Sequence, residues 1–454
     1  MQIDQLTVRN FRCFDKKEVA LRPGFNVLIG DNGSGKTAIL EAIGVGLIPL
    51  IRRLAPDSPE NNGHSSKTRD NNDVRIVTSG SPEQPTLEYA FPSAAGLLFT
   101  LMGHSFRMGQ IQMSLKDIIV NDGELVDQVR IIVRQISTET PPVLPVIAYF
   151  TSRRRWQSAW DSRSPFDQEA LEREVSGPTT RLDCYRTALA AETNERKVLQ
   201  WLMRFDIAAR QRNELNRTME AAKQAMLSCL EGFHQLRFDA IEWNLLAENT
   251  SGNILPTRML SDGQRNILSL VADIAFRCVT LNPELREEAT KETPGVVLID
   301  ELDLHLHPKW QRRIVDDLRR TFPKIQFIVT THSPLIIQSL RPGELIDLGP
   351  EVTDSPEEYV GKSPEDILEN VMEVAMPQRS QRSQEMIAAA EQYYSLLRQA
   401  SNHPDLPALR TELDRLMEPY EDNEAFIAAL RLERAASGMD TMTTHNGHPA
   451  GQAP

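Results

Sequence analysis

The sequence predicts an α/β fold in which a mixed or parallel sheet carries a glycine-rich phosphate loop, with a helical insertion and a helical C-terminal tail added. Three observations lead to this prediction. An apolar strand runs into the glycine-rich loop near residue 30 and then into a helix. Two further apolar strands alternate with helical patterns between residues 236 and 350. Residues 161–235 and 351–436 have the spacing of amphipathic helices.

Composition limits the class of protein. The chain has 454 residues, of which 40% are hydrophobic, so it can form two or three globular units. No apolar run approaches the roughly 18 residues that cross a bilayer, and no signal peptide opens the chain, so we expect a cytoplasmic protein without membrane contact. The four cysteines lack metal or disulfide spacing, which favours reduced structural thiols.

The net charge of -13 disfavours general binding to nucleic acid, so any DNA contact must be local. Three basic clusters could supply one. Those in residues 312–320 lie on a helical pattern, where such charges usually form a solvated face. The clusters are Arg52 with Arg53, Arg153 to Arg155, and Arg312, Arg313, Arg319 and Arg320.

Elements of the N-terminal lobe, residues 1–160, follow from apolar patterns. Strands are expected from Ile3 and at Phe25–Ile29, followed by a helix that starts inside the glycine-rich loop. Residues 58–73 are rich in Asn, Ser and Gly and predict a loop. Residues 74–150 are β-rich and end in a buried strand at 143–150.

The rest of the chain divides into four parts. A helical insertion covers 161–235, and a C-terminal lobe at 236–350 holds strands at 296–299 and 327–329. A helical tail for partner docking or assembly follows at 351–436, and packing against the head is its equally weighted alternative. Its first helix starts at Ser363, with a proline and two acids in the first turn. Residues 437–454 are expected to be disordered.

The glycine-rich loop fits the phosphate-binding pattern GxxxxGK[ST] between a strand and a helix. Its backbone N–H groups and the helix N-terminus would surround phosphate. Lys36 would reach the terminal phosphates of ATP, and the Thr37 hydroxyl would bind Mg²⁺. The loop consists of Gly30, Asp31, Asn32, Gly33, Ser34, Gly35, Lys36 and Thr37.

Two carboxylates follow the apolar strand at 296–299. Asp300 and Glu301 would stand at the carboxyl edge of the sheet, where ligands of open α/β sheets bind. Asp300 would hold Mg²⁺ through water, and Glu301 would orient or deprotonate the attacking water. Two acids after a strand are a weak signal alone, and the glycine-rich loop makes the pair informative.

The run LSDGQ precedes a further helical pattern. Ser261 and Gln264 fit a capping box, which is the structural explanation of the run. The same cap would direct N–H groups and the Ser261 hydroxyl at an anion in front of the helix.

These motifs resemble those of ABC ATPases. Their order matches Walker A, signature, Walker B and switch histidine, the last in the run TTHSP with His332. The resemblance implies that Ser261 and Gly263 of one subunit contact the γ-phosphate that Lys36 of another subunit holds, so ATP joins a head-to-tail homodimer or higher homo-oligomer. It also implies that Asp262 and Gln264 lie at the nucleotide, that Asp303 is the D-loop residue and that His332 contacts the γ-phosphate.

Within this superfamily the runs QLTVRNFRCF and LIDELDLHLHP resemble the RecF, SMC and OLD group. In that group the residue matching Arg12 approaches nucleotide. LHLHP is common there, which argues against His305 and His307 as a metal pair. The Q-loop glutamine stays unassigned between Gln110, Gln112 and others.

The chain differs from two members of that group. Only about 225 positions separate Lys36 from Ser261, too few for the long coiled coil of an SMC rod. No DxD motif of an OLD-type nuclease follows His332. We therefore expect an ATPase without a nuclease site of its own.

Residues 253–283, 144–150 and 363–372 are similar to the ATPase subunit of Septu anti-phage defence systems, the PtuA family. That resemblance implies an ATPase that regulates a separately encoded HNH nuclease, PtuB-like, with DNA bound through the complex. Two alternatives remain: a RecF-like DNA-repair ATPase that binds DNA directly, and a scaffold that binds ATP but hydrolyses it slowly.

Overall fold

The structure is a computed structural model. It describes residues 1–55, 71–81, 84–136, 138, 141–152, 181–189, 217–239, 244–349, 361–372, 374, 380–399 and 403–417. The chain forms two compact units, Met1–Ile367 and Leu368–Pro454. The boundary between them falls within the first helix of the predicted tail. Most of the predicted insertion at 161–235 and the helical pattern at 422–436 lie outside the described residues.

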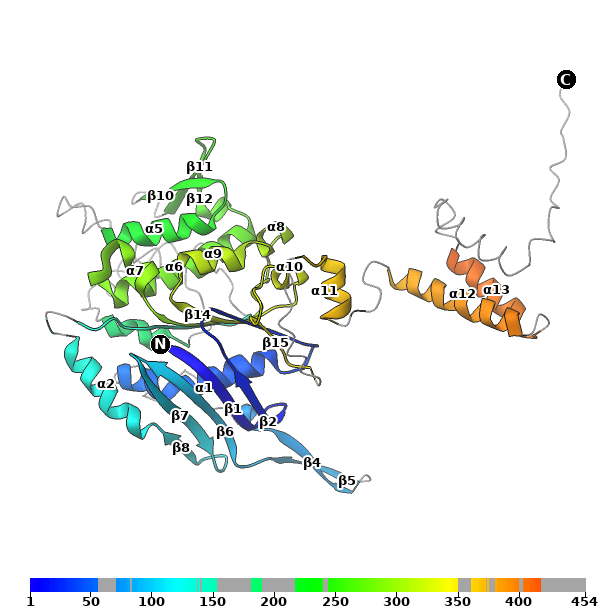
Figure 1. The fold of residues 1–454 in the computed structure, drawn as a ribbon, viewed down its shortest axis with the longest axis horizontal. Helices are drawn as coiled ribbons and strands as arrows, with labels where there is room; N and C mark the ends of the chain where they lie inside the picture. The colour runs from blue at the N-terminus through cyan, green and yellow to red at the C-terminus, as the bar shows by residue number, and fades with distance from the viewer. Residues whose placement is uncertain are drawn as a thin grey trace, which may run out of the picture. The chain divides into compact units, whose positions relative to one another are not determined.

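A parallel five-stranded sheet forms the centre of the first unit (Figure 1). All its neighbouring strands pair in parallel. The three strands β3, β14 and β13 are buried along their whole length, as expected for a sheet covered on both faces. The strand order is β15 (Leu345–Asp347), β3 (Phe25–Ile29), β14 (Ile325–Thr330), β13 (Gly295–Ile299) and β9 (Val146–Phe150).

A second five-stranded sheet is antiparallel. Its order is β2 (Phe14–Ala20), β1 (Gln2–Phe11), β6 (Ser93–Leu101), β7 (His104–Gln112) and β8 (Ile118–Asn121). The largely buried helix α1 (Lys36–Leu54) contacts β1, β6 and β7 of this sheet and β14 of the parallel sheet. Gln326 joins the two sheets because its side chain accepts from Ile3 N at 2.7 Å and donates to Ile3 O at 2.8 Å.

Smaller elements surround these two sheets. Strands β4 (Ile76–Ser81) and β5 (Gln84–Tyr89) form a hairpin, and β10 (Phe233–Asp239), β11 (Asn244–Asn249) and β12 (Ile254–Pro256) form an antiparallel sheet. The described helices of this unit also include α2 (Gly123–Gln135), α5 (Arg217–Cys229), α6 (Asp262–Leu281), α7 (Ala289–Glu292), α8 (Pro308–Gln311), α9 (Ile314–Thr321) and α10 (Pro334–Ile337).

The predicted strand at 143–150 is shorter in the structure. β9 begins at Val146, directly after Pro145, which has no N–H to give to a ladder. Leu144 bonds instead to the Asn282 side chain, donating at 2.7 Å and accepting at 2.9 Å. The prediction was therefore wrong for the first three residues and right for the buried core of the strand.

Helix α11 (Pro364–Asn370) begins as predicted, because Ser363 Oγ accepts from Asp366 N at 3.1 Å. In the second unit α12 (Gln381–Gln399) and α13 (Leu406–Met417) pack through Met386, Ala390, Tyr394, Leu413 and Leu416. Among the helices searched in the described part of the chain, not one is both long and apolar enough to cross a membrane. The α/β fold with a parallel core is confirmed.

Candidate nucleotide-binding site

The candidate site lies at the carboxyl edge of the parallel sheet. Gly30 follows β3, Asp300 follows β13 and Thr331 follows β14, and these strands are neighbours in the sheet. Parallel strands end at the same edge, so three segments that are far apart in sequence meet there. The sheet thereby brings the Walker A and Walker B residues together.

The Walker A loop needs its glycines for space and for backbone conformation. Gly30, Gly33 and Gly35 have φ angles of 137°, 87° and 96°, a region that side chains disfavour. A Cβ at Gly35 would clash with the Phe14 ring and with Cys13 Sγ, so the β1–β2 turn packs closely against the loop. Asp31, Asn32 and Gly33 at its tip are exposed.

Lys36 folds back onto its own loop. Its Nζ donates to Gly30 O at 2.7 Å and to Asp31 O at 3.0 Å. Burial lowers the pKa of Lys36, although Asp300, Asp31 and Glu301 act in the opposite direction. The ammonium group is thus held by two carbonyls that phosphate oxygens could replace.

A chain of hydroxyl and carboxylate groups links the two Walker motifs. Thr37 Oγ1 lies 3.1 Å from both carboxylate oxygens of Asp300. Thr330 Oγ1 donates to Asp300 Oδ1 at 2.7 Å and accepts from Glu301 N at 2.7 Å. Asp300 is 2% exposed. A hydroxyl and a carboxylate in contact are oxygen ligands of the kind that Mg²⁺ prefers, so the residues fit this cation.

Glu301 has a left-handed backbone, with φ of 52°, which is unusual for a residue with a side chain. Its N–H is held by Thr330, and its carbonyl accepts from Leu304 N at 2.9 Å in the turn that follows. Such conformations cost about 1–3 kcal/mol and occur often at functional sites. The turn therefore fixes the position of Glu301 at the strand end.

Asp303, the predicted D-loop residue, is hydrogen-bonded to the segment that contains His332. Asp303 Oδ1 accepts from Thr331 Oγ1 at 2.6 Å and from His332 N at 3.2 Å. His332 is exposed, and Ser333 caps α10 through Ile336 N at 3.3 Å. The structure thus joins Asp303 to the backbone of His332.

The signature segment forms the predicted capping box at the start of α6. Ser261 Oγ accepts from Gln264 N at 3.3 Å, and Gln264 Oε1 accepts from Ser261 N at 3.1 Å. Ser261 and Asp262 are exposed, and Asp262 pairs with Arg265. Among the described residues, the Ser261 side chain bonds only to Gln264.

The signature helix is also attached to the D-loop turn. Asn266 Nδ2 donates to Leu304 O at 2.8 Å, and a Cβ at Gly263 would lie 2.8 Å from His305 O. The backbone of His305 is left-handed, with φ of 61°. A shift of this turn would therefore change the positions of both the Walker B residues and the signature segment.

Arg12 lies in the β1–β2 turn, where it pairs with Glu41 of α1 and with Asp73. Its Nε donates to Asp73 Oδ1 at 3.1 Å. Near this group Tyr149 is buried, and burial with the neighbouring Glu41 raises the pKa of its hydroxyl well above the usual range. The predicted approach of Arg12 to nucleotide stays a prediction.

The sequence did not predict that the Thr330 hydroxyl bonds to both Asp300 and Glu301 N, although the TTHSP run that contains Thr330 was identified as the switch segment. The two Q-loop candidates point elsewhere: Gln110 Nε2 donates to Val45 O at 3.1 Å, and Gln112 Nε2 to Asn71 at 3.3 Å. Only the strand order could have indicated this, because both residues lie on β7 of the antiparallel sheet.

Basic residues of the α9 region are tied in ion pairs. Arg313 pairs with Glu231 and Asp317, and Arg319 pairs with Asp316 and Glu344. Their charges are therefore matched locally. The cluster Arg153 to Arg155 lies outside the described residues.

A family profile described as "AAA domain" matches residues 5–233, half of the chain. A second, described as "AAA domain, putative AbiEii toxin, Type IV TA system", matches residues 194–338. The chain belongs to the AAA-domain family and is an ATPase of the ABC, RecF and SMC type.

Named relatives include the retron Ec83 probable ATPase of Escherichia coli, 25% identical over 435 residues, covering 83% of this chain and 77% of that protein. The retron Vc95 probable ATPase of Vibrio cholerae is 40% identical over 144 residues, 31% of this chain and 27% of that protein. The Septu protein PtuA of Bacillus mycoides is 48% identical over 86 residues, 19% of this chain and 11% of that protein. The chain thus spans only a part of the last two relatives.

Among solved structures, the SMC head domain from Thermotoga maritima matches with a TM-score of 0.40 and 15% identity, over 76% of this chain and 94% of that one. The fold described above rests on the strand order and pairing within the chain itself.

Proposed function

We propose that this chain binds and hydrolyses ATP with Mg²⁺ at the carboxyl edge of its parallel sheet. The observation that carries the proposal is the chain of bonds from Thr37 through Asp300 and Thr330 to Glu301. Lys36 and the loop N–H groups would bind the phosphates, and Thr37 with Asp300 would hold the cation. When bound, Mg²⁺ neutralises charge on phosphate oxygens.

Glu301 would orient the attacking water and accept its proton. Its N–H is anchored to Thr330, so the carboxylate starts from a fixed point at the strand end. His332 is exposed and would contact the γ-phosphate, with Asp303 positioning its backbone. Arg12 would approach the nucleotide from the β1–β2 turn after leaving Glu41 or Asp73.

The signature is proposed to serve a second copy of the chain. Ser261 is exposed and its side chain bonds, among the described residues, only within its own cap. Ser261 and Gly263 at this helix N-terminus can therefore receive an anion held by another subunit. ATP would then join a head-to-tail dimer whose two sites each need both subunits.

Mixing two inactive variants tests this arrangement. Lys36→Ala removes the phosphate cation and Ser261→Arg blocks the signature, so each variant alone should have almost no ATPase activity. A mixed dimer holds one intact site, so random exchange should restore about a quarter of the wild-type rate. Failure of the mixture to regain activity while both variants are folded and are found together in one mixed dimer would contradict the shared site.

The chain is further proposed to belong to an anti-phage defence complex in which its ATP cycle regulates a separately encoded HNH nuclease. The support is its similarity to retron and Septu ATPases. The proposal gives the chain no nuclease site of its own. Glu344, an acid after the switch segment, is bound by Arg319 at 2.8 Å and by Arg341 N at 2.8 Å.

The helical hairpin α12–α13 is the proposed docking or assembly surface. A truncation after residue 374 preserves α11, whose Ile367 is buried in the first unit, and removes the hairpin. If the hairpin docks the nuclease, the truncated chain should lose co-purification with it but keep ATP turnover. Leu413→Asp, at a buried position of the hairpin, should have the same effect. Retained co-purification by both variants would contradict docking.

The alternative is a RecF-like ATPase that binds DNA directly. RecF of Edwardsiella ictaluri is 54% identical over 43 residues, which is 10% of this chain and 12% of that protein. Strong DNA binding by the chain alone that weakens steeply with salt would favour this alternative. DNA binding that needs the nuclease partner would favour the defence complex.

A further inference from the structure

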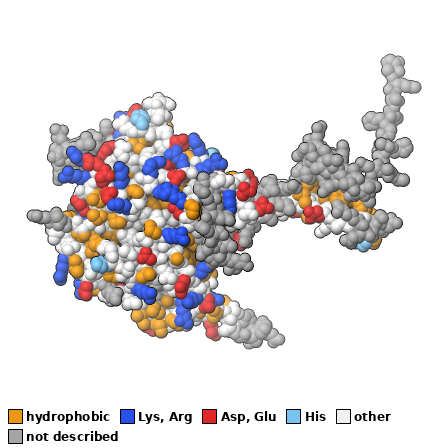
Figure 2. Space-filling view, viewed as in Figure 1, with side chains coloured by type: hydrophobic (Ala, Val, Ile, Leu, Met, Phe, Trp, Pro, Cys, Tyr) orange, Lys and Arg blue, Asp and Glu red, His pale blue; other side chains and the backbone are white. Residues whose placement is uncertain are grey.

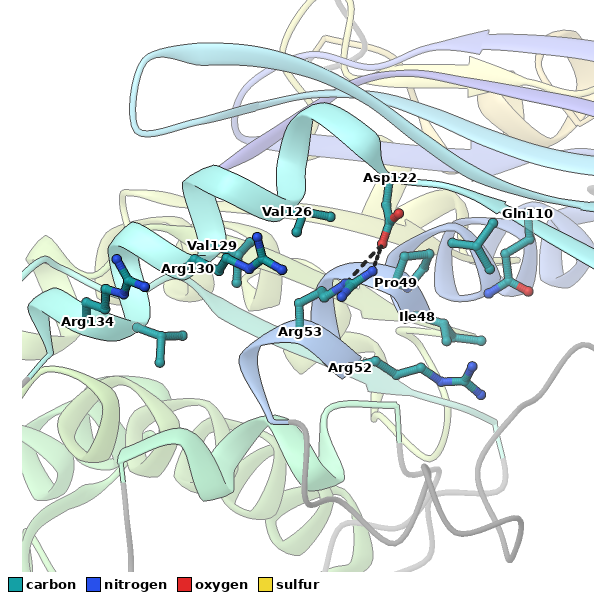
Figure 3. Close-up of a pocket in the computed structure, with 12 residues that line it drawn as sticks. Ile48, Pro49, Arg52, Arg53, Gln110, Asp122, Val126, Val129, Arg130 and Arg134 are labelled. Atoms are coloured by element: carbon teal, nitrogen blue, oxygen red, sulfur yellow. Dashed lines mark hydrogen bonds and ion pairs between the residues drawn. The ribbon is translucent and has the colours of Figure 1, made fainter.

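A basic pocket lies at the end of α1 that is remote from the Walker A loop (Figure 3). Its volume is about 750 Å³, and α1, α2, β7 and β8 supply its lining. Arg52 is sixteen residues along α1 from Lys36, which corresponds to roughly 24 Å of helix. The pocket is therefore separate from the proposed ATP site and does not depend on that proposal.

Four arginines line this basic pocket, Arg52 and Arg53 from α1 and Arg130 and Arg134 from α2, and Figure 3 shows Arg52 and Arg134 at its opposite ends. Among the described residues that line it, Asp122 is the only carboxylate. Asp122 is already bound by Arg53, whose Nε and terminal nitrogen lie at 3.1 Å and 3.0 Å. In a chain of net charge -13, this pocket has a strong local excess of positive charge.

The positive charges of the other three arginines, Arg52, Arg130 and Arg134, are only weakly balanced by acidic side chains among the described residues. Arg130 reaches Asp127 at 3.3 Å, but both side chains are mostly exposed, so the pair is weak. Arg52 Nε is buried and lacks a hydrogen-bond partner among the described residues. Arg134 has no ion pair within the described part of the chain. An anion in the pocket would satisfy these donors.

Helix dipoles give a simpler explanation for part of the pattern. Arg52 and Arg53 stand in the last turn of α1, and Arg134 in the last turn of α2, where cations are favourable. That explains their positions along each helix. It does not explain why residues of both helices line one pocket and repel one another there.

One face of α2 supplies both the apolar wall and two cations of the basic pocket. Val126, Val129 and Val133 recur at helical spacing with Arg130 and Arg134, so aliphatic and guanidinium groups face the same space. Ile48 and Pro49 of α1 add to the apolar part. Figure 2 shows hydrophobic side chains beside basic ones on the side of the molecule where α2 lies.

This lining selects among ligands. Guanidinium groups recognise phosphate through paired donors, and the volume is within the range of small-molecule sites. Aromatic side chains, on which single-stranded nucleic acid stacks, are missing from the described lining, and a concave pocket does not fit a duplex. The apolar wall suits the flat body of a base or a similar group.

We propose that the basic pocket binds a small phosphorylated ligand of nucleotide size, such as a nucleoside di- or triphosphate. Arg130 and Arg134, four residues apart on one face of α2, would bind the phosphates, and the valine face of α2 with Ile48 and Pro49 would contact the rest of the ligand. The chain would then have two separate nucleotide sites, one at each end of α1.

Calorimetric titration separates the two sites. The wild-type chain should bind two equivalents of ADP and the Lys36→Ala chain one, and the latter should also bind tripolyphosphate. On the Lys36→Ala background, Arg130→Gln combined with Arg134→Gln should weaken the binding of both probes by about tenfold or more, because charge-assisted hydrogen bonds are lost. Both substituted side chains are exposed, so this variant should fold like the parent chain.

A matched control is Arg237→Gln with Lys291→Gln, which removes the same charge from exposed positions elsewhere. It should leave both affinities unchanged. Equal losses in the pocket and control variants, or no binding of either probe by the Lys36→Ala chain, would overturn the proposal. The proposal would also be overturned if the Lys36→Ala chain bound a 5′-phosphorylated hexathymidylate but bound neither ADP nor tripolyphosphate, because that result indicates a nucleic-acid strand as the ligand.

If the wild-type and Lys36→Ala chains each bind one equivalent of ADP and the pocket substitutions abolish it, the basic pocket stands and the Walker A assignment fails. If the single equivalent is lost with Lys36→Ala instead, the pocket fails and the Walker A assignment stands. The two proposals can thus be rejected separately.

Discussion

Two helix N-termini are central to the proposed ATP site, and they differ in whether a side chain caps them. Helix α1 starts after Gly35, which has no side chain to cap it, so its first N–H groups have no side-chain acceptor there. Helix α6 starts after Ser261, and its capping box provides side-chain acceptors for two N–H groups, those of Ser261 and Gln264. Uncapped N–H groups at a helix start favour an anion as their partner. We infer that the N-terminus of α1 binds phosphate within its own subunit. The N-terminus of α6 is a preformed surface that contacts the phosphate of another subunit when the dimer forms.

The bonds around each terminus show the same difference. Residues beside α1 are bonded across the sequence, as in Thr37 to Asp300. The Ser261 side chain bonds only three residues away among the described residues. Substitutions near the N-terminus of α1 should therefore change ATP turnover. Substitutions near the N-terminus of α6 should change ATP-dependent dimerisation. The predictions below test that division.

Glu301→Gln should have the largest effect. The amide keeps the size of the side chain but cannot accept the proton, so ATP turnover should fall by about 10²–10⁴. The ATP-bound dimer should live longer because its ATP persists. Turnover and dimer lifetime would be measured by phosphate release and light scattering, with Glu288→Gln as an exposed control. Unchanged values of both would mean that Glu301 is not the base.

Thr330→Val should reduce turnover by about tenfold, since Asp300 and Glu301 N lose their shared hydroxyl. The free energy of unfolding should fall by about 1–3 kcal/mol because buried polar groups lose a partner. Thr330→Ser retains the hydroxyl and should restore most of the turnover. Equal turnover in the serine and valine variants would show that the bridge does not position Glu301.

Gly263→Ala should act on the signature side. The new Cβ would meet His305 O, so crowding should cost about 1–3 kcal/mol of stability or displace the D-loop turn. ATP binding by a single subunit should persist, and the ATP-dependent dimer should weaken in sedimentation velocity. Gly123→Ala has open space around its Cβ and is the control. Loss of ATP binding by the monomer would contradict the assignment of ATP binding to α1 and of dimerisation to α6.

Cys13 offers the smallest effect, on the α1 side. It is the exposed cysteine, while Cys184, Cys229 and Cys278 are buried. Partial burial raises the pKa of Cys13, so the thiolate fraction and the rate of alkylation should increase with pH across the neutral and mildly alkaline range. Its Sγ lies 2.7 Å from the Cβ position built at Gly35, so bound ATP should slow labelling a few-fold. Mass spectrometry would count one modified thiol, and none in Cys13→Ser.

Local patterns predicted most of the core elements. The glycine-rich loop, the capping box at Ser261, the helix start at Ser363, and the apolar strands β3, β13 and β14 depend on neighbouring residues and hold in the structure. The start of β9 was predicted too early because the side chain that replaces the ladder, Asn282, is 138 residues away from Leu144.

The sequence by itself determined the motif types and their order, because each motif is a short run whose backbone conformation is set locally. Tertiary structure decided which motifs touch. Strand order placed Thr330 between Asp300 and Glu301, turned Gln110 and Gln112 away from the site, and set Gly263 against His305. It also gathered arginines of α1 and α2 around one pocket. These contacts join residues that are distant in the chain, and only the folded packing of the sheets and helices brings them within bonding distance.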